Sequence, residues 1–99
     1  MAKWTFLTNH ALVLSLIAKN PSITAIELAR VIGITERAVR RVIADLHDGG
    51  YISKKKAGRG ISYSISPDLQ LRHDTHQDIA VGDFLEALGW ERKKRNRSL

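Results

Sequence analysis

The stretch Gly33-Ile34-Thr35-Glu36-Arg37-Ala38-Val39-Arg40-Arg41-Val42-Ile43-Ala44-Asp45-Leu46 predicts a short helix with two opposed faces. Thr35 can cap this helix, because its hydroxyl oxygen accepts a hydrogen bond from a backbone N–H of the first turn. Apolar residues then recur at spacings of three and four, on one stripe: Ala38, Val39, Val42, Ile43 and Leu46. The opposite side carries Arg37, Arg40, Arg41 and Ala44. Such a helix suits the major groove of duplex DNA, whereas a solvated basic face is the plainer alternative.

The charge of the chain is unevenly distributed. The 99 residues carry a net charge of +6 and a sequence pI of about 10.1, which is typical of nucleic-acid-binding domains. Residues 35–59 contain seven basic and three acidic residues, whereas residues 60–91 contain one arginine and six acidic residues. Residues 92–99 add five basic residues, and we expect them to form a disordered basic tail. The positive charge is therefore concentrated in residues 35–59, which contain the helix described above and the segment after it, and in residues 92–99.

Several classes of protein are disfavoured by composition. The chain has no cysteine, so disulfides and thiol catalysis are excluded. No nucleophile stands in a recognised catalytic setting and no glycine-rich loop follows a strand, so we expect no enzymatic activity and no cofactor. The most apolar stretch, between His10 and Lys19, is too short to span a bilayer, and no cleavable signal precedes it. We therefore expect a cytoplasmic protein without a membrane partner.

Two further helices are predicted before the central one. The first runs from Trp4 to Asn20, with Thr8 or Asn9 as its cap, and it is apolar nearly all round. The second begins after Thr24, and Glu27 three residues later completes a capping-box pattern. Gly33 then supplies a left-handed residue that ends the second helix, and Thr35 begins the third only two residues later.

These residues resemble the helix-turn-helix motif, in which a small residue, a turn glycine and two β-branched residues stand at fixed spacing. Ala29, Gly33, Val39 and Val42 match those places. After Asp48-Gly49-Gly50, the segments 51–54 and 61–65 read as two strands around a basic, glycine-rich turn. A hairpin of this kind behind a helix-turn-helix is the wing of a winged helix.

Three helices followed by Gly-Tyr-Ile and a basic hairpin resemble the MarR/ArsR-type regulators of bacteria and archaea. The resemblance implies a mainly α fold with a small β-hairpin, a three-helix core plus wing, and here an extra C-terminal helix. It also implies a homodimeric regulator of transcription that binds double-stranded DNA, with helix 35–48 in the major groove and wing 54–60 on phosphates or the minor groove. Arg59 best matches the wing arginine of the family, although Ala57 replaces the aspartate that many members carry two residues earlier. The DNA-binding residues are then expected to be Thr35, Arg37, Arg40, Arg41, Ala44, Lys54, Lys55, Lys56 and Arg59.

The C-terminal third is expected to form a connector and a dimerisation helix. The predicted units are a winged helix-turn-helix domain over 1–66, the connector and helix over 67–91, and the tail over 92–99. Asp74, Thr75 or Asp78 is expected to cap the helix, and Gly89 to end it. Apolar side chains beyond the need of one small domain suggest a dimer interface made by Leu12, Leu16, Val81, Phe84, Leu85 and Leu88.

Alternatives remain at two points. His73 and His76, at i and i+3, are weak candidates for a metal site. A tetrahedral site needs further ligands, so the preferred interpretation is a polar connector with surface histidines, and we expect no metal. The sequence leaves open whether a small molecule or a metal acts as an effector. The rival functions are a winged-helix module that binds protein and a non-specific architectural DNA binder.

Overall fold

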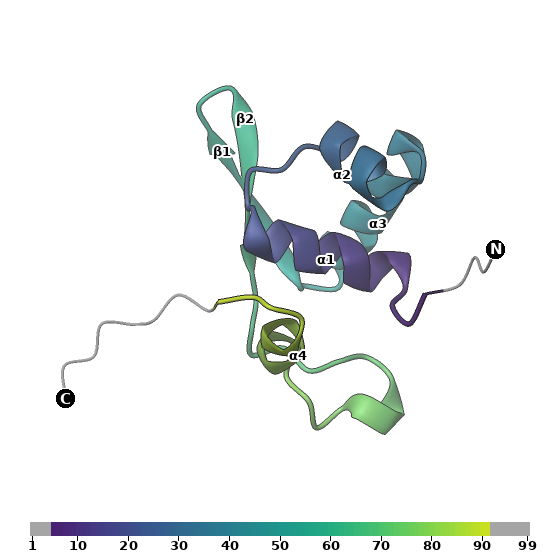
Figure 1. Ribbon diagram of the computed structural model, residues 1–99. Helices are drawn as coiled ribbons and strands as arrows, with labels where there is room; N and C mark the ends of the chain where they lie inside the picture. Colours follow the sequence, from purple (N-terminus) through teal and green to yellow (C-terminus); the bar gives the residue numbers. More distant parts are fainter. Residues whose placement is uncertain (1–4, 92–99) are drawn as a thin grey trace.

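The computed structural model describes residues 5–91 as four α-helices, one short 3-10 helix and one β-hairpin (Figure 1). The elements in chain order are α1 (Asn9–Lys19), α2 (Ala25–Ile32), α3 (Glu36–Asp48), β1 (Ile52–Ala57), β2 (Gly60–Ile65), η1 (Asp74–His76) and α4 (Val81–Ala87). Helices α1, α2 and α3 pack against one another, and the hairpin projects from them (Figure 1). The fold class is as predicted: a three-helix core, a wing and an extra C-terminal helix.

Helix α1 begins later than the sequence pattern suggested. The Thr8 hydroxyl accepts a hydrogen bond from the Ala11 N–H at 3.2 Å, and residues 5–8 are not helical. The expected start at Trp4 lies outside the described residues, and the continuation through residues 5–8 is wrong because Thr8 caps the helix. Phe6 is 92% exposed, so it does not cover α1 within this chain.

The turn between α2 and α3 follows the predicted chemistry. The Thr24 hydroxyl accepts from the Glu27 N–H at 3.1 Å and the Glu27 carboxylate accepts from the Thr24 N–H at 2.9 Å, which is the complete capping box. Gly33 has φ 86, a left-handed conformation, and the Ile34 N–H donates to the Ala29 carbonyl at 3.2 Å. This tight stop lets the Thr35 hydroxyl cap α3 immediately, by accepting from the Ala38 N–H at 3.0 Å.

The wing is longer than predicted and turns in two residues. The antiparallel strands pair from Ile52 with Ile65 at the base to Ala57 with Gly60 at the tip. Gly58 has φ 61 in the two-residue loop, where type II′ hairpin turns favour glycine. Midway along β2, the Tyr63 N–H donates to the Pro21 carbonyl at 2.9 Å. This bond tethers the wing to the α1–α2 loop.

The connector after the wing folds back on itself and places α4. Gln70 and Ala80 form an isolated antiparallel bridge, so the segment between them, including η1, is a closed loop. The expected cap of α4 by Asp74, Thr75 or Asp78 is wrong, because α4 starts after Ala80 without a side-chain cap. Backbone carbonyls of the connector cap the helix instead. The Val81 N–H donates to the Leu69 carbonyl, and the Gly82 N–H donates to the Pro67 carbonyl.

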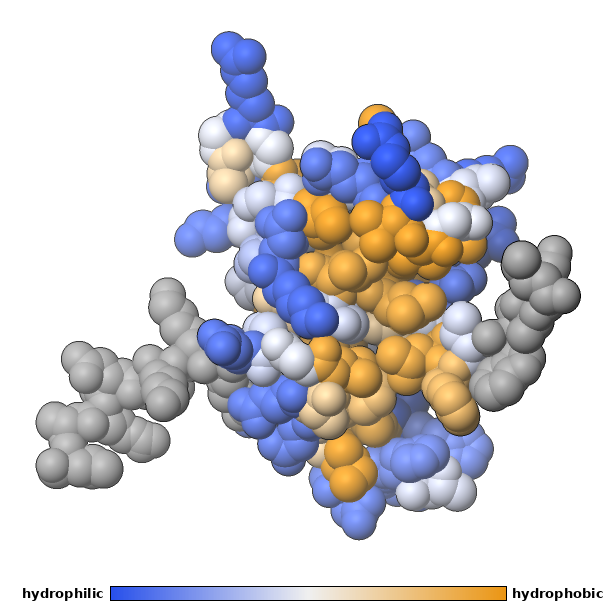
Figure 2. Space-filling view, in the orientation of Figure 1, coloured by the Kyte–Doolittle hydropathy of each residue, from blue (hydrophilic) through white to orange (hydrophobic). Residues whose placement is uncertain are grey.

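One hydrophobic core joins the four α-helices and the start of the wing. Its buried members come from these elements and from the loop between α1 and α2: Val13, Leu14, Ile17, Ala18, Ile23, Leu28, Val39, Val42, Ile43, Leu46, Tyr51, Ile52, Val81 and Leu85. Apolar side chains also gather on the outer surface, over the face where α1 lies and on toward α4 (Figure 2). Within residues 5–91, no helix is long and apolar enough to cross a membrane.

Candidate nucleic-acid interface

Helix α3 divides into the two faces that its periodicity predicted. Val39, Val42, Ile43 and Leu46 are buried in the core. Arg37, Arg40, Arg41 and Ala44 are all exposed on the opposite side of the helix. A rigid helix therefore presents three arginines and a small alanine to solvent, with its back fixed by packing.

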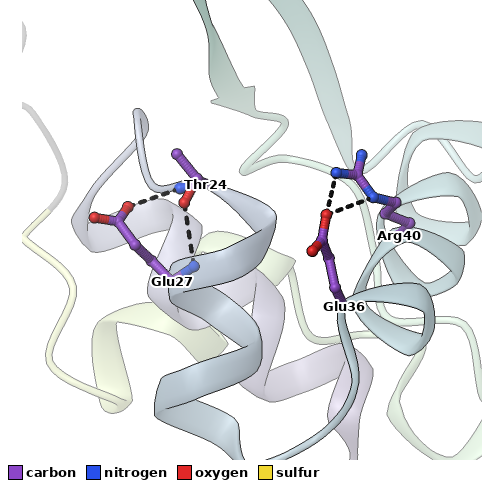
Figure 3. Close-up of polar contacts among 4 residues, drawn as sticks. All are labelled: Thr24, Glu27, Glu36 and Arg40. Carbon is purple, nitrogen blue, oxygen red and sulfur yellow. Dashed lines mark hydrogen bonds and ion pairs between the residues drawn. The ribbon is translucent and has the colours of Figure 1, made fainter.

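One of the three arginines is held by a neighbour on the same helix. The Arg40 guanidinium donates to the Glu36 carboxylate from both Nε, at 3.1 Å, and Nη2, and both bonds end on Oε2 (Figure 3). The two residues are four apart, with the acid nearer the helix N-terminus, which is the favourable order. Exposed pairs of this kind contribute only about 0.3–0.5 kcal/mol to stability, so the main effect is on the direction of Arg40. This pair was not predicted from the sequence, although its i, i+4 spacing is a signal for it.

Arg37 and Arg41 differ from Arg40 in this respect. Within residues 5–91, neither side chain makes a hydrogen bond or an ion pair. Their side chains are therefore free to reorient toward any nearby acceptor.

The three wing lysines do not share one face of the hairpin. Successive side chains on a strand point to opposite sides. Lys54 lies opposite Tyr63 and Lys56 opposite Ile61, on the same side as the core residue Ile52, whereas Lys55 lies opposite Ser62 on the other side. All three lysines are exposed. The run of lysines thus distributes positive charge over both faces of the wing.

A groove of about 420 Å³ lies between α3 and the wing. Arg40 and Ile43 line it from α3, and Lys54, Arg59 and Tyr63 line it from the hairpin. Residues 22–25, from the end of the α1–α2 loop to the first residue of α2, complete the wall. Three of the expected DNA-binding cations, Arg40, Lys54 and Arg59, are therefore brought to one groove, whereas Lys55 lies on the opposite side of the hairpin. No local pattern indicated the part played by residues 22–25.

The histidine pair of the connector is engaged by a threonine. The Thr75 hydroxyl lies 2.8 Å from His73 Nδ1 and 3.0 Å from His76 Nδ1, and the ring centroids are 6.2 Å apart. Residues 5–91 contain no group of three or more histidine, cysteine, aspartate or glutamate side chains placed to hold a metal ion. The two histidines thus form part of the local structure of η1.

A second, larger hollow lies at the other end of α3. It has a volume of about 820 Å³ and lies between the start of α1, the end of α3 and the connector. Leu14, Leu46 and Val81 form part of its apolar lining, and His10 and Arg72 lie among its polar residues. This hollow is formed within a single chain.

The six residues expected at a dimer interface fall into two groups. Val81 and Leu85 are completely buried in the core of the single chain, so they offer no surface to a partner. Leu12, Leu16, Phe84 and Leu88 are half-buried, and among these Leu16 and Phe84 also pack against the core. Leu12 on α1 and Leu88, just after α4, are the two that retain apolar surface without belonging to that core cluster.

The fold, the turn chemistry and the arginine face define a winged helix-turn-helix protein. Residues 8–53, slightly less than half of the chain, match the family model described as winged helix-turn-helix DNA-binding.

Two solved structures have a similar fold, and one relative is similar in sequence. A predicted DNA-binding transcriptional regulator from E. coli is similar, with a TM-score of 0.56 and 24% identity, over 79% of this chain and 70% of that one. A MarR protein from Peptoclostridium difficile is similar with a TM-score of 0.56 and 20% identity, over 82% of this chain and 47% of that one. An uncharacterized protein from Methanocaldococcus jannaschii is 37% identical over 57 residues, which are 57% of this chain and only 12% of the relative.

Proposed function

We propose that this chain is a regulator of transcription that binds specific sequences in duplex DNA as a homodimer. The observation that carries the proposal is the exposed face of Arg37, Arg40, Arg41 and Ala44 on a helix whose opposite face is buried. A helix of this width enters a major groove, where arginine can donate two hydrogen bonds to guanine O6 and N7. Ala44 permits close approach or contacts a thymine methyl group.

In this proposal the wing supplies affinity rather than specificity. Lys54, Lys55 and Lys56 neutralise phosphates, and such contacts position a protein without reading bases. Arg59, at the tip of the hairpin, reaches the minor groove next to the major groove that α3 occupies. Thr35 caps α3 and lies at the helix end, where a backbone N–H or the hydroxyl can approach a phosphate.

The proposal of a homodimer rests on the small number of base pairs that one helix can contact. One short helix contacts only a few base pairs, so a second copy is needed to define a longer site. Leu12, Leu16, Phe84 and Leu88 form the proposed interface. Apolar side chains gather on the face of the molecule that runs from α1 toward α4 (Figure 2). A two-fold dimer places half-sites about 34–36 Å apart, or a multiple of this distance.

The proposal is tested by selecting bound duplexes from a random DNA library. The size of the bound complex is measured in the same assay. We expect an imperfect palindrome bound by two copies of the chain. A library that returns no enriched sequence, with affinity that depends only on salt, would instead indicate an architectural binder. Absence of DNA binding would favour a module that binds protein.

A further inference from the structure

The three exposed arginines of α3 are not equivalent, because only Arg40 has a fixed partner. Glu36 accepts hydrogen bonds from Arg40 Nε and Nη2, whereas Arg37 and Arg41 make no ion pair within the described part of the chain. Glu36 is the first residue of α3 and follows the Thr35 cap directly, so the helix start fixes its backbone. The ion pair with this residue therefore biases where the Arg40 guanidinium lies.

The atoms used in this pair leave a particular edge of the guanidinium available. A guanidinium carries five N–H donors in a rigid plane. Glu36 engages the side formed by Nε and Nη2, and Nη1 makes no hydrogen bond within residues 5–91. The end formed by Nη1 and the second N–H of Nη2 thus stays free, and two parallel donors of this kind match O6 and N7 of guanine.

The position of Arg40 on the molecule agrees with this use. Arg40 lines the groove between α3 and the wing, beside Lys54 and Arg59. Lys54 can hold a phosphate backbone against the wall of the groove, which limits the distance between α3 and the bases. The side chain of Arg40 is 66% exposed, so its free edge is accessible to a partner.

We propose that Glu36 is a positioning residue for base recognition: it holds Arg40 so that the free edge of the guanidinium reads one guanine, while Arg37 and Arg41 bind phosphates. This inference rests on the proposed function, because it concerns how α3 reads DNA. Holding an arginine before binding reduces the side-chain entropy that recognition would otherwise lose. Glu36 also repels phosphates, so its presence costs general affinity in exchange for discrimination at one position.

This assignment is tested by measuring the affinity of the full chain for duplexes that differ from the selected site at single base pairs. The variants are Glu36→Gln, Arg40→Lys and the double variant. Gln cannot pair with Arg40 through a charge, and Lys cannot donate two fixed parallel bonds. Asp48→Asn is the matched control, because it removes one negative charge from the same helix at a residue that does not contact Arg40. Thermal unfolding of each variant verifies that α3 remains folded.

We expect Glu36→Gln to reduce discrimination at one guanine by about twofold, because an exposed i, i+4 ion pair biases a side chain only weakly. Arg40→Lys should reduce discrimination at the same guanine by about tenfold, which lies within the range of a bidentate contact, and the double variant should lose no more than Arg40→Lys alone. Asp48→Asn should leave all base preferences unchanged. The inference is overturned if Glu36→Gln keeps the wild-type preference at every position, or if its effect adds to that of Arg40→Lys. A wild-type chain that selects no sequence refutes the proposed function itself, which is a different outcome.

Discussion

His10 Nε2 lies 2.8 Å from Asp45 Oδ2, so the first turn of α1 is joined to α3 by two side chains that are 35 residues apart in the sequence. Both side chains are about half exposed, at 49% and 57%. Water therefore screens the contact, and its contribution to folding is small.

His10→Ala should lower the free energy of unfolding by less than about 1 kcal/mol, since an exposed hydrogen-bonded pair contributes little net stability. Urea denaturation at pH 7 measures this change. A loss above about 2 kcal/mol would mean that the pair is essential for the packing of α1 on α3.

Leu85→Ala should destabilise the chain by about 2–5 kcal/mol, because Leu85 is completely buried and its truncation leaves a cavity in the core. Leu88→Ala, at a half-buried position beyond the core cluster, is the matched control and should cost much less. The comparison uses the same denaturation assay. Equal losses for the two variants would contradict the packing of α4 on the core.

Replacing both Leu12 and Leu88 by Gln should convert the proposed dimer into a folded monomer with weaker DNA binding. Both residues keep apolar surface without belonging to the core cluster, so the fold should tolerate the change. Sedimentation at tens of micromolar measures the mass, and Val31→Gln, at a residue that is 64% exposed on α2, is the control. A wild-type chain that sediments as a monomer would refute the dimer.

Lys54→Gln should weaken DNA binding more than Lys55→Gln. Lys54 shares the groove with Arg40 and Arg59, whereas Lys55 lies on the other face of the wing. Each loss should be similar on all sequences, and removal of one phosphate contact should reduce the salt slope by about one unit. Titrations at several salt concentrations measure both effects. A larger loss for Lys55→Gln would place the DNA on the other face of the hairpin.

Local chemistry explains why much of the fold could be predicted. The Thr24–Glu27 capping box, the left-handed Gly33 and the Thr35 cap are determined by residues within a few positions of one another. The buried and exposed faces of α3 follow from helical spacing alone. The arrangement of the wing lysines also follows from strand alternation once the strand is known to continue to Ala57.

The remaining features depend on contacts between distant segments. Periodicity predicted an apolar stripe on α4, but it could not show that Val81 and Leu85 fill the core of the same chain. The start of α4 depends on carbonyls of Pro67 and Leu69, more than ten residues earlier. The groove that joins Arg40 to Lys54 and Arg59 exists only because the wing folds back beside α3.

The claim that α3 reads DNA sequence is tested most directly by measuring the affinity of the wild type and of Arg40→Ala. Each protein is titrated with the selected duplex and with a scrambled duplex of the same composition. Fluorescence anisotropy at fixed salt is suitable. We predict that Arg40→Ala costs about 1–3 kcal/mol on the selected duplex and much less on the scrambled one. Equal affinity of both proteins for the selected duplex, with the base preference unchanged, would contradict the assignment of α3 to the major groove.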